Sequence, residues 1–216
     1  MRNFPLLIIL MFVAAHLIEA SENAALNPND IHRIASLSPR EEFPLVQGRD
    51  LQLATFSQED FASFYESFIA QYANSMYTSH IFQNQEETRA AAKNEMIRLF
   101  PDGLETKGQY LFKMKRDEEE IGVLWYAEKR SSDATTAWLC DIYVNPSFRR
   151  MGYAKAAIVK METHLKSLGK TRVGMSVFAT TPFAKDLYES LGYVVVKTVF
   201  SPDSKEILRY DLSKSL

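Results

Sequence analysis

The chain has 216 residues, of which 46% are hydrophobic and 24% charged. This composition indicates one medium-sized globular domain and excludes a disordered, collagenous or multi-span membrane protein. Its 25 Lys and Arg residues nearly balance its 27 Asp and Glu residues, so the net charge of -2 disfavours general nucleic-acid binding. Cys140 is the single cysteine, which excludes an intrachain disulfide and the usual Cys/His zinc modules.

The first 20 residues have the pattern of a secretory signal peptide. Arg2 supplies a positive charge, residues 4–18 are almost wholly apolar, and Ala20 offers a small residue at a cleavage point. The apolar run is shorter than the roughly 20 residues that span a bilayer, so we expect export and no membrane span after processing. The alternative is a mis-assigned start codon and a cytoplasmic protein.

Residues 21–48 contain several chain-breaking Pro, Asn and Ser residues and are predicted to be a linker. The domain then occupies residues 49–216, where hydrophobic periodicity alternates between about two and about 3.6 residues and predicts a mixed α/β fold. Ser57 and Asp60 form a capping signature at the start of the first helix. The expected helices are 57–72, 85–98, 152–168 and 182–191. The expected strands are 51–56, 110–115, 121–127, 135–144, 171–178, 193–200 and 206–212, with a charged hairpin tip at 116–120.

The first motif with chemical content is the segment from Val144 to Ala154, in which a strand ends and a helix begins. Free N–H groups and the positive end of the helix dipole meet at such a point and favour a phosphate group. Gly152 permits close approach of a pyrophosphate, and Arg149 and Arg150 add positive charge. The turn matches neither the dinucleotide nor the P-loop pattern. Taken alone, it is equally well explained as a solvated turn.

A second motif, from Ala184 through Tyr188 to Tyr193, makes the first one specific. Together the two segments resemble the acyl-CoA-binding half of the GNAT superfamily of N-acetyltransferases. The family signature [QR]xxGx[GA] matches at Arg149, Gly152 and Ala154, and the family segment Axx(L)YExLG[FY] matches from Ala184 onward. The segments 99–104 and 122–126 also resemble a bacterial branch of unassigned substrate, so the resemblance covers roughly residues 49–216.

This resemblance implies a mostly antiparallel central sheet with flanking helices and a splayed parallel strand pair, here 135–144 and 171–178. It also implies direct transfer of an acetyl group from acetyl-CoA to an amine, without a metal. The backbone of Ile142 and Val144 is expected to hold the pantetheine arm. The resemblance assigns the pyrophosphate to the backbone amides of Arg150, Met151, Gly152, Tyr153 and Ala154.

Tyr188 is the expected proton donor to the leaving thiolate, since a phenol with a pKa of about 10 is protonated at neutral pH. The alternative is a buried structural tyrosine on one helix face with Ala184 and Leu191. The sequence departs from the family at Thr181, where many members have an Asn that contacts the cofactor. Thr181 offers a hydroxyl to the cofactor or caps the helix that begins at Pro182. The glutamate that the family often carries near Ser176 is absent, which leaves the general base undetermined.

Asp141 lies in an apolar strand, where a carboxylate is costly unless it is paired or functional. It is a candidate base, acting through water, or an anchor for a substrate ammonium. The alternative is a structural acid bonded to backbone or to an arginine. Cys140 is expected to be a small core residue rather than a nucleophile. His32, His80 and His164 lack the spacing of metal ligands.

Two classes of function follow from these features. The leading one is an acetyl-CoA-dependent N-acetyltransferase acting on a primary amine of a small molecule or peptide. The alternative is a catalytically idle acyl-CoA-binding or interaction module, favoured by Thr181, by the missing glutamate and by the expected export. The sequence identifies neither the acceptor nor the oligomeric state.

Overall fold

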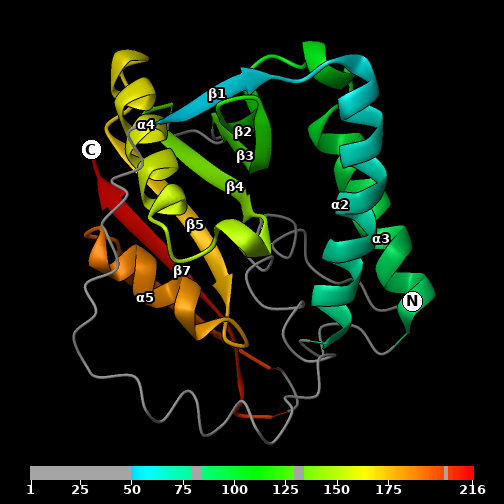
Figure 1. Ribbon diagram of the computed structural model, residues 1–216. Coiled ribbons are helices and arrows are strands. Elements are labelled where there is room, and N and C mark those ends of the chain that lie inside the picture. The colour runs from blue at the N-terminus through cyan, green and yellow to red at the C-terminus, as the bar shows by residue number, and fades with distance from the viewer. Residues whose placement is uncertain (1–49, 79–83, 129–133, 202–203) are drawn as a thin grey trace, which may run out of the picture.

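The computed structural model describes residues 50–78, 84–128, 134–201 and 204–216, and these form one layered α/β structure (Figure 1). A seven-stranded sheet has helices α2 and α3 on one face and helices α4 and α5 on the other (Figure 1). The helices are α2 (Gln58–Thr78), α3 (Gln85–Leu99), α4 (Tyr153–Ser167) and α5 (Pro182–Ser190), with short 3-10 turns η3 (Gly103–Glu105) and η4 (Pro146–Phe148). The strands are β1 (Leu51–Thr55), β2 (Gln109–Arg116), β3 (Glu119–Glu128), β4 (Thr136–Val144), β5 (Arg172–Phe178), β6 (Val194–Phe200) and β7 (Ile207–Ser215).

The strand order is β1-β2-β3-β4-β5-β7-β6, and every neighbouring pair is antiparallel except β4 with β5. This arrangement confirms the expected mixed α/β fold with one parallel pair. Each expected helix and strand is present, with three main differences at the ends. Helix α2 runs to Thr78 rather than ending at 72. The β2–β3 turn is tighter than residues 116–120, since Arg116 and Glu119 already pair. Strand β7 runs to Ser215 rather than ending at 212.

The start of α2 is fixed by the predicted capping box. The amide of Ser57 donates to the carboxylate of Asp60 at 2.8 Å, and the amide of Asp60 donates to the Ser57 hydroxyl at 3.1 Å. The aromatic stripe of this helix packs as expected, because the rings of Phe64 and Phe68 lie edge-on to the fully buried Trp125 of β3. Capping and burial together place α2 over β3.

Strands β4 and β5 pair over only three residue positions, the last of which joins Trp138 to Gly174. The Trp138 ring lies over Gly174 so closely that a Cβ there would be 2.5 Å from a ring carbon. Glycine is therefore required at this position. Beyond this pair the two strands share no ladder, which leaves a gap between the remainder of β4 and β5.

A β-bulge interrupts β4 beside this gap. Trp125 of β3 pairs with Asp141 while Tyr126 pairs with Leu139, so Cys140 has no opposite residue. A bulge reverses the alternation of side chains along a strand. Leu139 and Ile142 consequently both pack into the core under α4, whereas Asp141 turns toward α2.

In the described ranges, no helix has the length and apolar character needed to cross a membrane. The expected signal peptide, residues 1–20, and the expected linker, residues 21–48, lie outside the described residues.

Candidate active site

The turn between β4 and α4 presents free backbone N–H groups, as the first motif predicts. Gly152 is the N-cap of α4 and has a φ of 85°, while Arg150 has a φ of 64°. The amides of Arg150, Met151 and Gly152 donate to no acceptor within the described part of the chain, and all three residues are exposed. Free amides at the positive end of a helix dipole are suited to bind an anion. The two adjacent candidates, Tyr153 and Ala154, begin the helix, with Tyr153 buried.

The Arg149 side chain is directed back to the end of β4. Its Nε donates to the carbonyl of Val144 at 3.0 Å, and its guanidinium lies 5.9 Å from the centre of the Tyr143 ring. The carbonyl of Val144 therefore already accepts a bond from the protein. Arg149 fixes the turn to the strand in addition to supplying positive charge next to the free amides.

Ile142 and Val144 lie on β4 beyond its last pair with β5, and their side chains are buried in the core under α4. Their antiparallel partners are Leu124 and Gly122 of β3. On the β5 side, this part of β4 has no strand beside it. An extended ligand can occupy the gap and use the free edge of β4 for strand-like hydrogen bonds.

Tyr188 is 1% exposed and its ring packs against Tyr193. Its hydroxyl has no hydrogen-bond partner among the described residues. Burial and the negative charge of Asp141 both raise the pKa of this phenol, which therefore keeps its proton at neutral pH. A buried hydroxyl without a partner costs about 1–3 kcal/mol, so packing alone does not explain why position 188 is Tyr rather than Phe. Ala184 and Leu191 share the core face of α5 with it, as the structural alternative requires.

Asp141 is 2% exposed and lines a cavity of about 490 Å³ between α2 and strands β2 to β4. Its negative charge also contributes to the raised pKa of Tyr188. The side of the cavity opposite the sheet is formed by Phe64, Ser67, Phe68 and Gln71 of α2. The structure therefore brings together Asp141 and Tyr188, which the sequence proposed separately.

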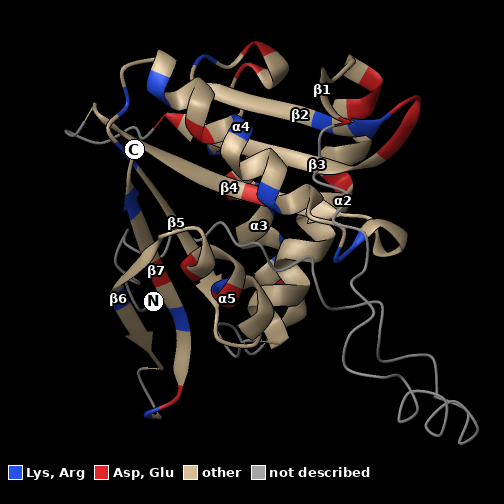
Figure 2. Ribbon diagram, turned by 60° about the vertical axis from the view of Figure 1, so that its left-hand side comes forward, with Lys and Arg blue, Asp and Glu red and all other residues tan. Residues whose placement is uncertain are grey.

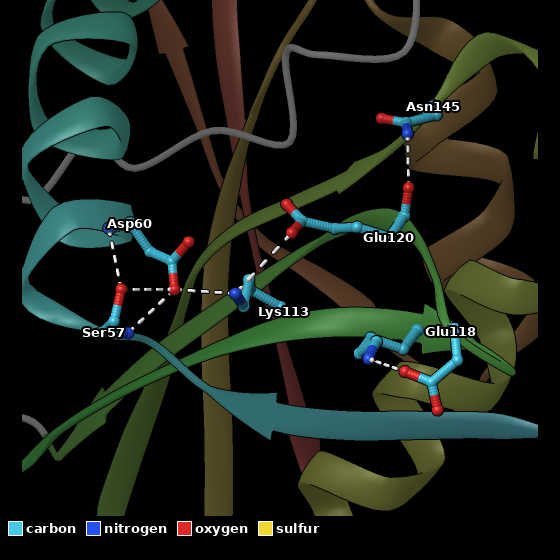
Figure 3. Close-up of polar contacts among 7 residues, drawn as sticks. Ser57, Asp60, Lys113, Glu118, Glu120 and Asn145 are labelled. Atoms are coloured by element: carbon cyan, nitrogen blue, oxygen red, sulfur yellow. Dashed lines mark hydrogen bonds and ion pairs between the residues drawn. The ribbon is translucent and has the colours of Figure 1, made fainter.

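Acidic side chains dominate the charge of this cavity. Among the described residues, Glu59, Asp60, Glu120 and Asp141 line it together with a single cation, Lys113. The Lys113 ammonium lies 2.7 Å from Asp60 and 3.9 Å from Glu120 and so joins α2 to the β2–β3 hairpin (Figure 3). Figure 2 shows acidic positions gathered near the joined ends of β2 and β3. The surplus of carboxylates favours a positively charged occupant.

The network at the cavity mouth is ordered by hydrogen bonds. The bond from Lys113 and the two bonds from Ser57 lower the pKa of Asp60 from 3.8 to about 2. Asn145 donates from its side-chain amide to the carbonyl of Glu120 at 2.9 Å (Figure 3). Sequence reasoning missed Lys113, Glu120 and Asn145 as cavity residues, because only the sheet register brings them together; Asp60 was noticed only as a cap.

Three other positions are resolved by their contacts. Cys140 is buried, and burial, Asp141 and Glu95 raise its pKa well above the ordinary value, so the thiol is no nucleophile. Thr181 occupies the N-cap position of α5, but its hydroxyl donates to the Phe178 carbonyl at 2.8 Å and caps no amide. Of the two alternatives for Thr181, capping of α5 by its side chain is therefore not realised. Ser176 is buried in β5, where its hydroxyl donates to Asp211.

No cluster of potential metal ligands occurs in the portion of the chain that is described. His164 Nδ1 lies 2.7 Å from the Tyr126 hydroxyl, and His32 and His80 are outside the described ranges.

Comparison with known proteins fits this geometry. Residues 61–193, more than half of the chain, match the model of the acetyltransferase (GNAT) family. The chain belongs to the GNAT family. It is an N-acetyltransferase by this membership, and the resemblance inferred from its two motifs is confirmed.

One relative is YycN of Bacillus subtilis, described as an uncharacterized N-acetyltransferase. It is 27% identical over 152 residues, which are 70% of this GNAT chain and 97% of YycN. YdgE of the same organism, described in the same words, is 25% identical over 146 residues, or 66% of this chain and 91% of YdgE. The crystal structure of YycN superposes with a TM-score of 0.66 at 25% identity and covers 72% of this chain and 99% of its own.

The fold is also shared with the spermidine N-acetyltransferase of Vibrio cholerae, solved with CoA and spermine. Its TM-score is 0.56 at 17% identity, with 77% of this GNAT chain and 95% of that chain covered. The PaiA N-acetyltransferase of Thermoplasma acidophilum, solved with coenzyme A, gives a TM-score of 0.53 at 17% identity, with 77% and 99% covered.

Proposed function

We propose that this protein transfers the acetyl group of acetyl-CoA to a primary amine of a small molecule or peptide, by direct attack in a ternary complex. The observation that carries the proposal is the gap between β4 and β5, which ends beside Asp141 and Tyr188. The free amides at Gly152, which follows the C-terminal end of β4, supply a site for the CoA phosphates. Structures of this fold solved with CoA support the choice of cosubstrate.

The acceptor arrives as a cation in this proposal. Amines with a lysine-like pKa of about 10.4 are ammonium ions at neutral pH, and the cavity lined by Asp141 carries four carboxylates against one ammonium. Asp141 attracts the ammonium toward the gap from the α2 side. The nitrogen must lose a proton before it attacks the thioester carbonyl.

Tyr188 serves the leaving group. Its hydroxyl is protonated, buried and without a partner among the described residues, so it can donate to the thiolate of CoA as the C–S bond breaks. Such a hydroxyl has no existing hydrogen bond to break when the ligand binds. This role accounts for a hydroxyl that core packing leaves unsatisfied.

A catalytically idle acyl-CoA-binding module is the second candidate. Thr181 favours it, since the hydroxyl at this position is already bonded to the Phe178 carbonyl. Release of free CoA from acetyl-CoA, measured against a panel of alkylamines, amino acids and peptides, separates the two functions. Thermal stabilisation by CoA with turnover of at least one amine supports the enzyme. Stabilisation without turnover of any amine overturns it in favour of the idle module.

We further propose that the protein is exported and that residues 1–20 are removed. The proposal rests on the charged start, the apolar run and the small residue at position 20. The N-terminus of the mature protein is then Ser21 or a neighbour.

A further inference from the structure

A buried serine on β5, the strand that borders the gap opposite β4, is bonded to a carboxylate of the next strand, β7. Ser176 of β5 is 2% exposed, and its hydroxyl donates to Asp211 Oδ1 at 2.7 Å. Asp211 belongs to β7, and the two residues are direct partners in the β5–β7 ladder. Strands β5 and β7 lie side by side in Figure 1, although these residues are 35 positions apart in the sequence.

The sheet places this pair on the same face as Asp141. Val173, Met175 and Val177 of β5 pack into the core under α4 and α5. Side chains alternate along a strand, so Gly174 and Ser176 face α2 and α3. Gly174 lies in the last β4–β5 pair, and Ser176 is the next residue on its face, where the strands have already parted.

The hydrogen bonds leave the pair suited to proton transfer. Ser176 spends its only proton on Asp211, so its oxygen can accept a proton from another group. Asp211 Oδ1 also accepts a bond of 2.9 Å from Arg209 Nε. Asp211 Oδ2 has no partner among the described residues, and the side chain is 17% exposed.

We propose that Ser176 and Asp211 accept the proton that the acceptor amine loses in the reaction. The inference rests on the proposed acetyl transfer and adds the group that transfer requires. The ammonium gives a proton to the Ser176 oxygen as the Ser176 proton passes to Asp211. The amine nitrogen then bonds to the acetyl carbonyl carbon, the C–S bond breaks, and the thiolate takes a proton from Tyr188, while the second proton of the nitrogen passes to water as the amide forms. Asp211 and Tyr188 afterwards exchange protons with solvent.

Several charged groups surround this pair and shape its pH dependence. Arg209 is hydrogen-bonded to Asp211. Lys197 of β6 is the ladder partner of Asp211 on the side away from β5. Tyr72 of α2 interacts electrostatically with Arg209 and with Glu95 and Arg98 of α3. Asp141 of β4 stands across the gap. Arg209 is 8% exposed, and it keeps the Asp211 carboxylate in a fixed orientation.

The test compares two acceptors that differ in the charge of the reacting nitrogen. One is the best alkylamine of the panel, and the other is the matching alkoxyamine, in which oxygen replaces the neighbouring CH₂ and the nitrogen is uncharged at neutral pH. Ser176→Ala should lower kcat for the alkylamine by about 10²-fold or more, as expected when a proton acceptor is lost. The alkoxyamine should lose less than about 3-fold, since its nitrogen has no ammonium proton to remove.

Ser213→Ala is the matched control, because Ser213 is also a buried serine, on β7 rather than β5, and its hydroxyl donates to the Val173 carbonyl instead. It should leave both rates and the thermal stabilisation by CoA unchanged. The double variant Ser176→Asp/Asp211→Ser exchanges the two groups across the ladder. Its kcat should regain at least a tenth of the kcat that is lost in the single variant Asp211→Asn. It also keeps the proposal testable if the single variants fold poorly.

The outcomes are distinct. A greater loss with the alkylamine than with the alkoxyamine, and a Ser176→Ala rate that recovers as pH rises, support the pair. Equal losses for both acceptors, with normal CoA stabilisation, show that Ser176 and Asp211 only hold the strands and overturn the inference while acetyl transfer stands. No turnover of either acceptor by the wild-type protein overturns the proposed function and this inference with it.

Discussion

Asp141 and Tyr188 belong to different layers of the molecule, β4 and helix α5, yet the negative charge of Asp141 contributes to the raised pKa of the Tyr188 phenol. The bulge at Cys140 turns Asp141 toward the cavity beneath α2, while its neighbour Ile142 stays in the core with Tyr188. The two groups to which we assign roles in acetyl transfer are therefore coupled electrostatically across the sheet.

Tyr188→Phe should lower kcat by about 10- to 10⁴-fold, the range expected for loss of one proton-transfer group. The phenyl ring still fills the core, and removal of an unsatisfied hydroxyl should leave the free energy of unfolding equal or higher. Steady-state kinetics and a CoA thermal shift check this. Equal turnover by wild type and variant would assign Tyr188 a structural role.

Asp141→Asn should raise KM and lower kcat for cationic acceptors together, and should flatten the rise of rate with pH. The change keeps shape and hydrogen bonding but deletes the charge that attracts the ammonium. Glu118→Gln is the control, since it removes one negative charge from a side chain that is 99% exposed. A much lower melting temperature with normal kinetics in the folded fraction would show that Asp141 is a structural acid.

Gly152→Val should abolish the thermal stabilisation that CoA confers, because the side chain blocks phosphates from the amides at the start of α4. Gly169→Val is a matched control at the other end of the same helix. Both glycines have positive φ, 85° and 74°, and a Cβ at Gly169 meets nothing within 4 Å. Each variant should lose about 1–3 kcal/mol of stability through backbone strain. If CoA stabilises the Gly152 variant as it does wild type, the phosphate site is elsewhere.

Asp60→Asn should reduce stability above about pH 5 and make no difference near pH 2. The folded protein lowers the Asp60 pKa from 3.8 to about 2, so the ionised carboxylate stabilises the fold above the unfolded value, and this contribution is lost as pH falls to 2. Melting temperatures of wild type and variant, measured from pH 7 to pH 2, should converge across this range. A constant difference at all pH values would show that ionisation of Asp60 is irrelevant.

Mass spectrometry of the natively expressed protein should find an N-terminus at Ser21 or a neighbouring residue. The charged start, the apolar run and Ala20 predict this cleavage. Recovery of cytosolic protein that begins at a later methionine would contradict export.

Local sequence was enough to predict most of the fold. Periodicity located every helix and strand, and Gly169 and Gly192, both with positive φ, follow helices where the sequence places their ends. The two short 3-10 turns were missed, since three residues carry no periodicity. The length of β7 was underestimated because Ser213 and Lys214 carry no apolar signal.

The candidate site also contains residues that local sequence predicts and residues that only the tertiary fold places. Arg149, Gly152 and Tyr188 could be predicted because each lies within a contiguous motif, whereas Asp211 could not, because only the β5–β7 register places it beside Ser176. The bulge at Cys140 also leaves no signature in a strand of apolar residues. The use of the Thr181 hydroxyl depends on the path of the backbone after β5, where the Phe178 carbonyl accepts its proton.

The short ladder between β4 and β5 also limits how firmly the two halves of the sheet are connected. Three residue pairs are the only strand pairing between the block β1–β4 and the block β5, β7 and β6 in the described sheet. A ligand lying along the gap would act as an eighth strand inserted into the sheet. Its hydrogen bonds would join the two groups of strands more tightly. Amide hydrogen exchange along the β5-facing edge of β4 should therefore slow sharply when CoA binds.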